Sequence, residues 1–470
     1  MSLKEPLPVA PGTTPDARDG QPHRATAWPE ARAAAVRAGA AARAGRAPLG
    51  VPLGQALGQV LAEPLLALTD LPPFDTSAMD GWAVAGPGPW TVREEGAVLA
   101  GQAPGAATVD GEAVRIATGA RVPSGTTAVL RTEHSRTEPS GTERTRTEPS
   151  GTERSAPEGA LLHALREVVP GQDIRPRGQE CRSGDELLPA GTVVTPAVLG
   201  LAAAAGYDEL RVSPRPRVEI LVLGDELLTA GLPHDGLIRD ALGPMLGPWL
   251  TALGADVLAT RRIGDEAEEL YAAVTGSTAD LVLTTGGTAA GPVDHVHGVL
   301  AKAGATLLVD GVKVRPGHPM LLARLGAEPN RAEPGRAELT RAEPGRPGHV
   351  RHLVGLPGNP LAAVSGLLTL AEPLLRALAD QGQGDPPRVP VQDEVHGHPY
   401  DTRLVPVVRR DGRAVPLRYN GPAMLRGIAT ADGLAVVPPG GARPGQELDV
   451  LDLPWPTAEG AVPAQGACFT

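Results

Sequence analysis

The stretch DLVLTTGGTAAGPVDHVHGVLAKAG, residues 280–304, carries the pattern that decides the fold. A continuous apolar run leads into two glycines, and apolar residues at helical spacing follow. The same order of strand, turn and helix recurs from VEILVLG (218–224) onward. Strands that are apolar throughout are typical of a parallel sheet covered by helices on both faces. The sequence therefore predicts a three-layer α/β domain over residues 214–380.

The regions on either side of this domain have other patterns. Residues 1–27 combine Pro, Gly and charge without periodicity, which predicts a disordered leader. Apolar residues recur at helical spacing in 28–45 and in 53–67, which predicts N-terminal helices. From residue 381 onward, short strand-like runs predict a small β domain that closes the chain. The expected fold class is multidomain α/β plus β.

Two polar segments are internal repeats. TEPSGTER occurs at 137–144 and again at 147–154, and RAEP occurs at 331 and at 341. Strand-like runs stand beside both segments. We expect expanded hairpin loops over 136–155 and 327–346, because lengthening a surface loop costs little closure entropy.

The composition does not favour a nucleic-acid-binding protein, a membrane protein or a disulfide-rich secreted protein. The 470 residues include 43 Lys or Arg and 54 Asp or Glu, and a net charge of −11 does not favour a nucleic-acid-binding surface. The N-terminus lacks a signal-peptide core, and no stretch is expected to reach the roughly 20 apolar residues of a membrane helix. The two cysteines, Cys181 and Cys468, are too few for a disulfide framework. We expect a cytoplasmic protein with no membrane and no nucleic-acid partner.

Three glycine-containing loops are expected at the carboxyl edge of the parallel sheet, where such sheets bind ligands. They lie at 224–227, 284–291 and 355–360, and nearby carboxylates are Glu226, Asp240 and Asp294. Glycines let the backbone approach a ligand closely, helix N-termini bind phosphate, and carboxylates bind divalent cations. Together these features suggest a site for phosphate and a divalent metal. Ordinary tight turns, a helix capped by Asn359 and solvated carboxylates would explain the same residues.

A further candidate loop is LPPFDTSAMDGW (71–82), which is dense in polar and turn-forming residues between apolar runs. This composition is typical of an ordered functional loop. A capped turn around Phe74 is the alternative. RIATGARVP (115–123) similarly combines a strand-like run with a turn.

These motifs resemble those of molybdopterin molybdenumtransferases, the family of MoeA and the gephyrin E-domain. The resemblance covers roughly residues 30–440, and its motifs include PPFDTSAMDGWAV, RIATGARVPSGTTAVLRTE, TGGTAAGPVDH and GLPGNP. It implies a homodimer, in which each subunit carries a small inserted β domain and a C-terminal β-barrel-like domain. The implied boundaries are 28–84 for the N-terminal helices and the start of a connecting domain, 159–213 for the second part of that domain, 85–158 for the inserted domain and 381–470 for the last.

The resemblance also implies an activity: Mg²⁺-assisted insertion of molybdate into adenylylated molybdopterin, with release of AMP. A labile adenylylated intermediate suggests association with the molybdopterin adenylyltransferase that supplies it. Carried over by motif, the catalytic residues are Asp80, Thr118, Glu226 and Asp294, and the metal ligands are Glu226, Asp240 and Asp294. The pterin and the anions would be held by Gly286, Gly287, Thr288, Arg315, His318, Pro357, Gly358, Asn359 and Pro360.

Several positions depart from the family pattern where an oxyanion is expected to bind. The family's KPGKP is Arg315-Pro316-Gly317-His318-Pro319, and other departures are Ala241, Leu242, Ala362, Pro422, Asp401 and Pro406. Arginine keeps a permanent charge, whereas histidine is largely neutral near pH 7, so we expect weaker anion binding. Two hypotheses follow. One is an active transferase with a remodelled anion pocket, and the other is a non-catalytic paralogue that binds molybdopterin or a partner protein.

Overall fold

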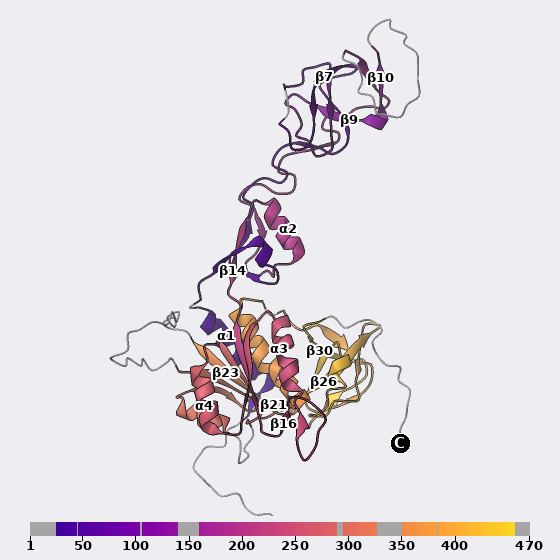
Figure 1. Cartoon of the computed structure of the whole chain (residues 1–470). Helices are drawn as coiled ribbons and strands as arrows, with labels where there is room; N and C mark the ends of the chain where they lie inside the picture. The colour runs from indigo at the N-terminus through magenta and orange to yellow at the C-terminus, as the bar shows by residue number, and fades with distance from the viewer. Residues whose placement is uncertain are drawn as a thin grey trace, which may run out of the picture. The chain divides into compact units, whose positions relative to one another are not determined.

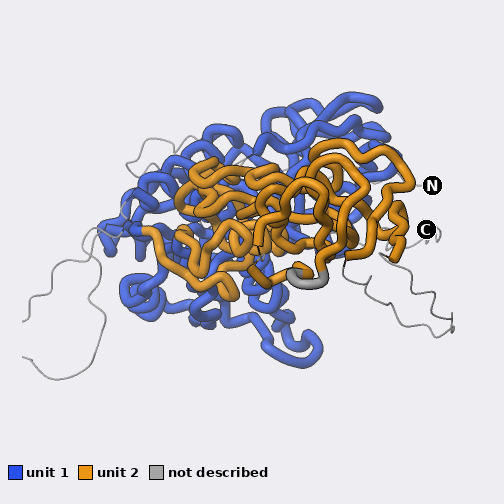
Figure 2. The backbone as a smooth tube through the Cα atoms, turned by 90° about the horizontal axis from the view of Figure 1, so that it is seen from above, with its two compact units in different colours: residues 1–47, 214–470 blue, residues 48–213 orange. Residues whose placement is uncertain are grey.

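The computed structural model describes residues 25–44, 46–103, 106–139, 159–288, 295–326, 350–382 and 384–455. The chain forms two compact units, residues 1–47 with 214–470 (unit 1) and residues 48–213 (unit 2), coloured separately in Figure 2. Figure 1 labels several of the elements used below.

The α/β part of unit 1 is built on a six-stranded sheet. Its strand order is β18 (Asp256–Ile263), β15 (Arg217–Leu223), β19 (Leu281–Thr285), β23 (Arg351–Leu356), β22 (Leu321–Leu325) and β20 (Thr306–Asp310). The first four strands are parallel, but β22 is antiparallel to both of its neighbours. The expected all-parallel sheet is therefore wrong at β22, because β22 returns directly to β23 as a hairpin.

Helices cover both faces of this sheet, as expected. Successive residues of β15 point to opposite faces of the sheet. Ile220 and Val222 pack in the hydrophobic core on one face, and Leu221 packs in the core on the other. The first core includes residues of α3 (Leu242–Ala252) and of the helix after β23, and the second includes residues of α4 (Ala267–Gly276) and α5 (Val296–Lys302). Burial on both faces explains why β15, β19 and β23 are continuously apolar, whereas the edge strand β18 is mostly exposed. The three-layer prediction is confirmed.

The helix after β23 consists of α6 (Pro360–Gly366), a π-helical turn η3 (Leu367–Ala371) and α7 (Glu372–Leu378). Pro373 has no N–H to bond the carbonyl of Thr369, which accounts for the widened turn. By length and composition, Pro360–Leu378 could cross a membrane, so the expectation of no such stretch is wrong. Its apolar window is 83% buried inside unit 1, as in a core helix.

Helix α1 (Trp28–Arg43) packs against α7 and η3 within unit 1. Trp28 Nε1 donates to Thr369 Oγ1 at 3.0 Å, and the Arg32 guanidinium donates to the carbonyl of Leu368. At Gly39 a Cβ would lie 2.3 Å from the Leu374 carbonyl oxygen, so only glycine allows this helix approach. The N-terminal helix predicted over 28–45 is therefore present, and it packs on the α/β part, which comes later in the chain.

A seven-stranded sheet completes unit 1. Its order is β1 (Thr26–Ala27), β21 (Val312–Arg315), β26 (Thr402–Arg410), β28 (Gly433–Val437), β30 (Glu447–Asp452) and β24 (Arg388–Pro390), with β27 (Arg413–Pro416) also on β26. The predicted strands after residue 381 are present. However, β1 and β21 come from outside 381–470, so segments far apart in sequence complete this sheet.

Unit 2 contains a six-stranded sheet in the order β10 (Ser135–Glu138), β11 (Leu161–Ala164), β7 (Trp90–Val98), β8 (Glu112–Ile116), β6 (Gly81–Val84) and β9 (Ala128–Arg131). This sheet extends beyond 85–158 at both ends. The pairing of β10 with β11 gives the expected hairpin around the first repeat, and β22 with β23 gives the second. Residues 136–138 belong to β10, and residues 140–158 and 327–349 lie outside the described residues.

The rest of unit 2 holds α2 (Pro196–Ala204), a sheet in the order β2 (Leu49–Pro52), β14 (Glu209–Ser213) and β3 (Val60–Leu61), and the pairs β4 (Leu65–Leu66) with β13 (Glu186–Leu188) and β5 (Thr76–Ser77) with β12 (Ile174–Arg175). The helix predicted over 53–67 is wrong: only Leu53–Gln55 forms a 3₁₀ turn. Gly58 adopts φ 74° and Pro64 interrupts the segment, so the leucine spacing serves short strands instead.

Candidate functional site

The loops after β19 and β23 meet at the carboxyl edge of the six-stranded sheet, as predicted. Gly286 N donates to the Leu356 carbonyl at 2.8 Å, and a Cβ on Gly358 would lie 3.7 Å from the Gly286 Cα. Gly287 has φ 66°, and a Cβ there would lie 3.0 Å from Val296 Cγ2. The structure thus brings Gly286, Gly287 and the Pro357–Pro360 loop together, and the backbone conformation requires glycine at 287.

The N-terminus of α6 lies on this edge but is partly occupied. Asn359 holds the N-cap position and Pro360 the first turn, as expected, yet the Asn359 side chain makes no capping hydrogen bond. Instead the amides of Leu361 and Ala362 donate to the Pro422 carbonyl at 2.9 and 3.2 Å. The expected Asn359 side-chain cap is therefore wrong, because a loop of the C-terminal β part supplies the acceptor.

Two of the three predicted metal carboxylates flank the short ladder of β16 (Leu227–Leu228) and β17 (Ile238–Arg239). Glu226 folds over Gly224, where a Cβ would lie 2.4 Å from Glu226 Oε2. Asp240 Oδ1 accepts from the amides of Leu242 (3.0 Å) and Gly243 (2.9 Å), so this carboxylate satisfies the first two backbone amides of α3. The third, Asp294, lies outside the described residues.

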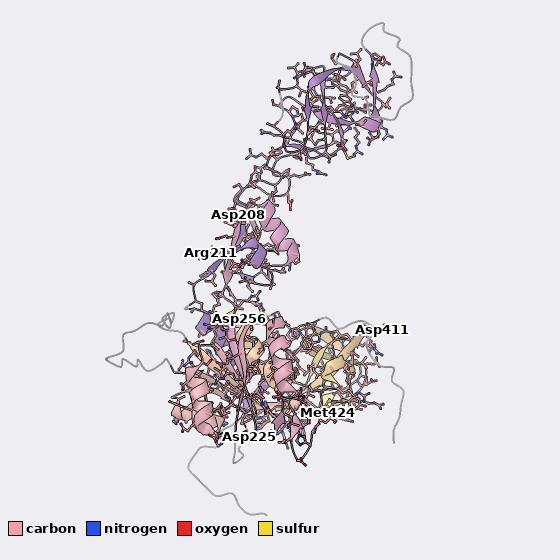
Figure 3. The ribbon with its side chains drawn as sticks, in the orientation of Figure 1. Asp208, Arg211, Asp225, Asp256, Asp411 and Met424 are labelled. Carbon is pink, nitrogen blue, oxygen red and sulfur yellow. The ribbon has the colours of Figure 1, made fainter. Side chains whose placement is uncertain are left out.

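The described residues contain no group of three or more His, Cys, Asp or Glu side chains placed to hold a metal. Carboxylates that sequence reasoning missed do lie on this edge. Asp225, labelled in Figure 3, and Asp265 exchange amide-to-carboxylate hydrogen bonds of 3.3 and 3.5 Å between the loops after β15 and β18. Their backbone amides hold these oxygens in place, so they order the loops.

Arg315 ends β21 and is half-exposed, and its Nε donates to Asp401 Oδ2 at 2.9 Å. Asp401, at the start of β26, is 10% exposed. His398 approaches the same carboxylate, but its Nδ1 accepts from the amides of Tyr400 (3.3 Å) and Asp401 (3.0 Å). The Nδ1 lone pair of His398 is therefore occupied by these backbone donors. Thus Arg315 meets a carboxylate at a position where the family resemblance implies another cation.

Arg403 is a cation that the sequence reasoning missed. It pairs in register with Arg315 across β21 and β26, and its guanidinium donates to the His396 carbonyl (2.7 Å) and Asn420 Oδ1 (2.9 Å). The available signal was closeness in sequence, since Arg403 lies at the start of β26, two residues after Asp401. His318 Nδ1 lies 2.8 Å from the Val312 carbonyl, which makes Nδ1 the donor and leaves Nε2 unprotonated in the neutral ring.

In unit 2 the loop 71–82 and the segment 115–123 come together. Asp80 Oδ1 accepts from Thr118 N at 2.8 Å, and Gly119 N donates to the Ser77 carbonyl at 2.8 Å. The two predicted catalytic residues of this unit are thus neighbours. Ser77 Oγ also donates to the Met79 carbonyl at 2.6 Å, which further orders the loop.

Two other carboxylates of unit 2 have lowered pKa values. Arg131 donates to both oxygens of Asp173 (2.9 and 2.8 Å), and this bidentate hydrogen bonding lowers the Asp173 pKa. The pKa of Asp70 is lowered first by the Ser183 amide, at 2.8 Å, and then by the Arg177 guanidinium. Both carboxylates therefore stay ionised at neutral pH. Asp173 keeps its ion pair with Arg131, and Asp70 keeps its hydrogen bond from the Ser183 amide.

Three regions of the chain match known families. Residues 27–206 match the MoeA N-terminal region (domain I and II), residues 219–377 a probable molybdopterin binding domain, and residues 388–453 the MoeA C-terminal region (domain IV). Together these three regions follow one another along the chain and span most of its described residues.

Relatives and solved structures agree with these matches. Molybdopterin molybdenumtransferase 2 of Mycobacterium tuberculosis is 32% identical over 413 residues, covering 83% of this chain and 91% of the relative. Molybdopterin molybdenumtransferase of a Nostoc species is 29% identical over 349 residues, covering 71% of each. A molybdopterin biosynthesis moeA protein from Pyrococcus horikoshii shares the fold, with a TM-score of 0.67, 20% identity, and coverage of 91% of this chain and 100% of that one. The chain belongs to the molybdopterin molybdenumtransferase family.

Proposed function

We propose that the protein is a transferase of molybdenum cofactor biosynthesis that inserts molybdate into adenylylated molybdopterin and releases AMP. The two thiols of the dithiolene displace two oxygens of molybdate, which leave with the thiol protons as two hydroxide ions, and molybdenum does not change its oxidation state. Cleavage of the phosphoanhydride takes up water and gives AMP and the pterin's phosphate. The observation that carries the proposal is the succession of a MoeA N-terminal region, a probable molybdopterin binding domain and a MoeA C-terminal region, with 91% of a molybdopterin molybdenumtransferase covered.

The loops at the carboxyl edge of the sheet suit the anionic part of this substrate. Gly286, Gly287 and Thr288 end β19, and Pro357–Pro360 end β23, so two backbone segments can approach one phosphate. Leu361 and Ala362 do not contribute amides, because Pro422 already accepts from them. We assign phosphate and pterin contacts to the glycine-containing loops themselves.

The donor set is compatible with Mg²⁺, which prefers oxygen ligands and keeps several waters. Glu226 and Oδ2 of Asp240 are carboxylate oxygens at this edge, and Asp294 would complete the set. When bound, Mg²⁺ would neutralise charge on the phosphoanhydride. Glu226 and Asp294 would also orient the reacting water. Asp80 and Thr118 of unit 2 would contribute from a neighbouring subunit of a homodimer.

Arg315 and His318 would bind molybdate, with Arg403 beside Arg315. The Asp401 carboxylate on Arg315 weakens this site without removing its charge, since Arg403, beside Arg315, is engaged only by neutral acceptors, the His396 carbonyl and Asn420 Oδ1. We therefore favour an active transferase with a remodelled anion pocket. We also propose a cytoplasmic location and association with molybdopterin adenylyltransferase, whose product is labile.

The test is AMP release from adenylylated molybdopterin by the full chain with Mg²⁺, with and without molybdate. Molybdate-dependent AMP release, coupled to reconstitution of an apo-molybdoenzyme, is the expected result. Tight pterin binding without AMP release would refute the transferase and support the non-catalytic paralogue. A Glu226→Gln variant provides the matched control for the metal-dependent step.

A further inference from the structure

Asn420 contacts Arg403, one of the two arginines proposed to meet molybdate. Its Oδ1 accepts from Arg403 Nη2 at 2.9 Å, and its Nδ2 donates to the Leu417 carbonyl at 2.8 Å. A guanidinium only donates and a carbonyl only accepts, so these two partners determine which way the Asn420 amide points. Aspartate could not donate to Leu417, and alanine could contact neither group. The position therefore requires a neutral amide.

The contact with Asn420 leaves the positive charge of Arg403 uncompensated. Arg403 Nη1 donates to the His396 carbonyl at 2.7 Å, so both of its partners are neutral. Within the ranges that the structure describes, no carboxylate lies at ion-pair distance from its guanidinium. Its register partner Arg315 instead donates from Nε to the Asp401 carboxylate. Arg403 is therefore the cation of the pair whose charge is available in full to an anion.

The loop that carries Asn420 also contacts the carboxyl edge of the six-stranded sheet. Two residues after Asn420, the Pro422 carbonyl accepts from the amides of Leu361 and Ala362 in the first turn of α6. The segment after β21 reaches the same turn, since a Cβ on Gly317 would lie 3.0 Å from the Ala362 carbonyl oxygen. All of these contacts lie within unit 1. The segments that hold the two arginines are thus fixed against one turn of the proposed substrate site.

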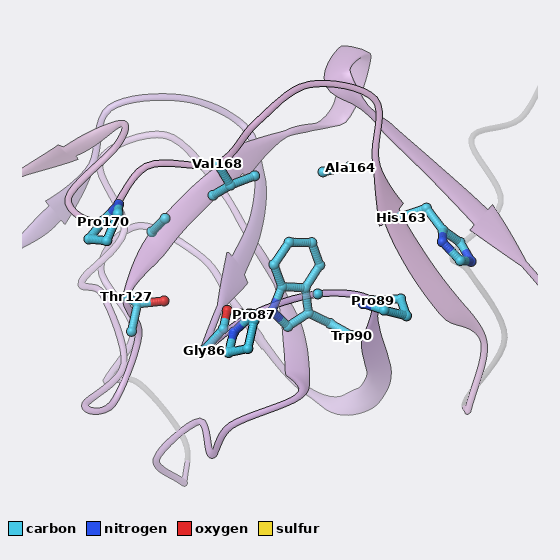
Figure 4. Close-up of a pocket in the computed structure, with 11 residues that line it drawn as sticks. Gly86, Pro87, Pro89, Trp90, Thr127, His163, Ala164, Val168 and Pro170 are labelled. Carbon is cyan, nitrogen blue, oxygen red and sulfur yellow. Dashed lines mark hydrogen bonds between the residues drawn. The ribbon is translucent and has the colours of Figure 1, made fainter.

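A hollow of about 620 Å³ in unit 2 (Figure 4) offers no comparable charge. Its lining includes Pro87, Pro89, Trp90, His163 and Pro170. The Trp90 indole already donates to the Ala85 and Gly86 carbonyls, and His163 is the only titratable side chain of the described lining. An oxyanion would meet no permanent positive charge there, whereas two guanidinium groups stand side by side next to Asn420.

We propose that Asn420 is a positioning residue for the oxyanion, which holds the Arg403 guanidinium beside Arg315 without neutralising it. A tetrahedral dianion can then accept hydrogen bonds from both arginines. A carboxylate at position 420 would also hold Arg403, but it would cancel its charge, as Asp401 does in part for Arg315. This inference rests on the proposed function, which assigns molybdate to the two arginines.

The test is equilibrium dialysis of molybdate against the full chain carrying Asn420→Asp or Asn420→Ala. Both variants lose the hydrogen bond to the Leu417 carbonyl, but Asn420→Asp keeps an acceptor for Arg403 and adds a negative charge. Asn420→Asp should raise the molybdate Kd roughly 10-fold, because the new carboxylate repels the dianion. Asn420→Ala should raise it only roughly two- to threefold, because Arg403 loses its orientation and keeps its charge. The difference between the variants should shrink at high salt.

The order of the two variants separates positioning of the anion site from support of the fold. Asn420→Asp should melt no lower than Asn420→Ala, because it keeps the contact with Arg403, and yet it should bind molybdate more weakly. Gln392→Glu is the matched control, since it adds the same charge near the other end of β26, where Gln392 N donates to the Ala414 carbonyl. It should leave the Kd unchanged. Molybdate binding by Asn420→Asp that equals or exceeds that of Asn420→Ala would overturn the inference.

AMP release measured on the same proteins separates this inference from the proposed function. In Asn420→Asp the KM for molybdate should rise, while the KM for adenylylated molybdopterin should stay unchanged. A wild-type chain that binds molybdate and loses affinity in Asn420→Asp, but releases no AMP, supports the inference and refutes the transferase. AMP release with the same molybdate dependence in the wild type and both variants refutes the inference and leaves the transferase standing. A wild-type chain that binds no molybdate would also overturn the inference.

Discussion

Asp401→Asn is expected to tighten molybdate binding. The carboxylate of Asp401 lies 2.9 Å from Nε of Arg315, so it neutralises part of the charge that an anion would meet. An anion on the outer nitrogens of Arg315 would sit roughly 3 Å beyond them and about 6 Å from the carboxylate. Asparagine keeps the shape and can still accept from Nε, so the main change is the loss of one negative charge.

The magnitude follows from Coulomb's law. Repulsion between a dianion and a carboxylate at about 6 Å is about 5 kcal/mol at an effective dielectric constant of about 20. Arg315 is 48% exposed, and solvent and salt reduce this value to about 1–2 kcal/mol. A free-energy change of that size corresponds to a roughly 5- to 30-fold lower Kd for molybdate.

The assay is equilibrium dialysis of molybdate against the full chain at low and at high ionic strength. The gain should shrink as salt increases, because the repulsion is screened. Asp452→Asn is the matched control, since Asp452 pairs with Arg409 in the same sheet but away from Arg315. Unchanged or weaker molybdate binding in Asp401→Asn would refute the reasoning and show that Asp401 serves to position Arg315.

Four more outcomes are expected. Thr369→Val should lower the free energy of unfolding by about 1–3 kcal/mol in urea titrations, because it leaves the buried Trp28 indole N–H without an acceptor; a loss near zero would mean that the indole finds another partner. Asp173→Asn should lower stability at pH 7, and the deficit should disappear in acid: the depressed Asp173 pKa means that its contribution is present above the unfolded value of about 3.9 and is lost as pH falls through the folded pKa. Urea titrations at pH 7 and pH 3 measure this difference, and an equal deficit at both values would contradict it. Asp294→Asn should abolish most Mg²⁺-dependent AMP release while circular dichroism stays unchanged, and undiminished release would remove Asp294 from the metal site. Deleting residues 140–157 should leave the melting temperature and AMP release almost unchanged, whereas deletion from residue 136 should lower the melting temperature, because Arg136–Glu138 pair with β11.

The α/β part was predictable because three of its four parallel strands, β15, β19 and β23, are buried on both faces and read as continuous apolar runs. The same reasoning gave the glycine loops at the carboxyl edge, since strand direction alone brings Gly286 and Gly358 to one side. The reversed strand β22 was not predictable from periodicity, which carries no direction. The helix expected over 53–67 failed because leucine spacing alone cannot distinguish a helix from short strands separated by Gly58 and Pro64.

The features of the site that could not be predicted from the sequence are contacts between segments far apart in the chain. Pro422 occupies amides of α6, and Asp401 engages Arg315, although each pair is separated by tens of residues. Neither contact has a local pattern. Asp80 and Thr118 could be grouped only through the family resemblance, and the backbone amide of Thr118, which no side-chain motif reveals, makes their contact.

The sheet that joins β1, β21 and β26 constrains how the chain can be made. Thr26 pairs with Val312, and Val314 pairs with Thr402, so neither neighbour of β21 is adjacent to it in sequence. During synthesis, β21 leaves the ribosome well before β26 does. Until β26 has been made, the edge of β21 that pairs with it has no partner strand. A nascent chain halted near residue 380 would present that edge to other chains, which makes chaperone protection most valuable in this interval.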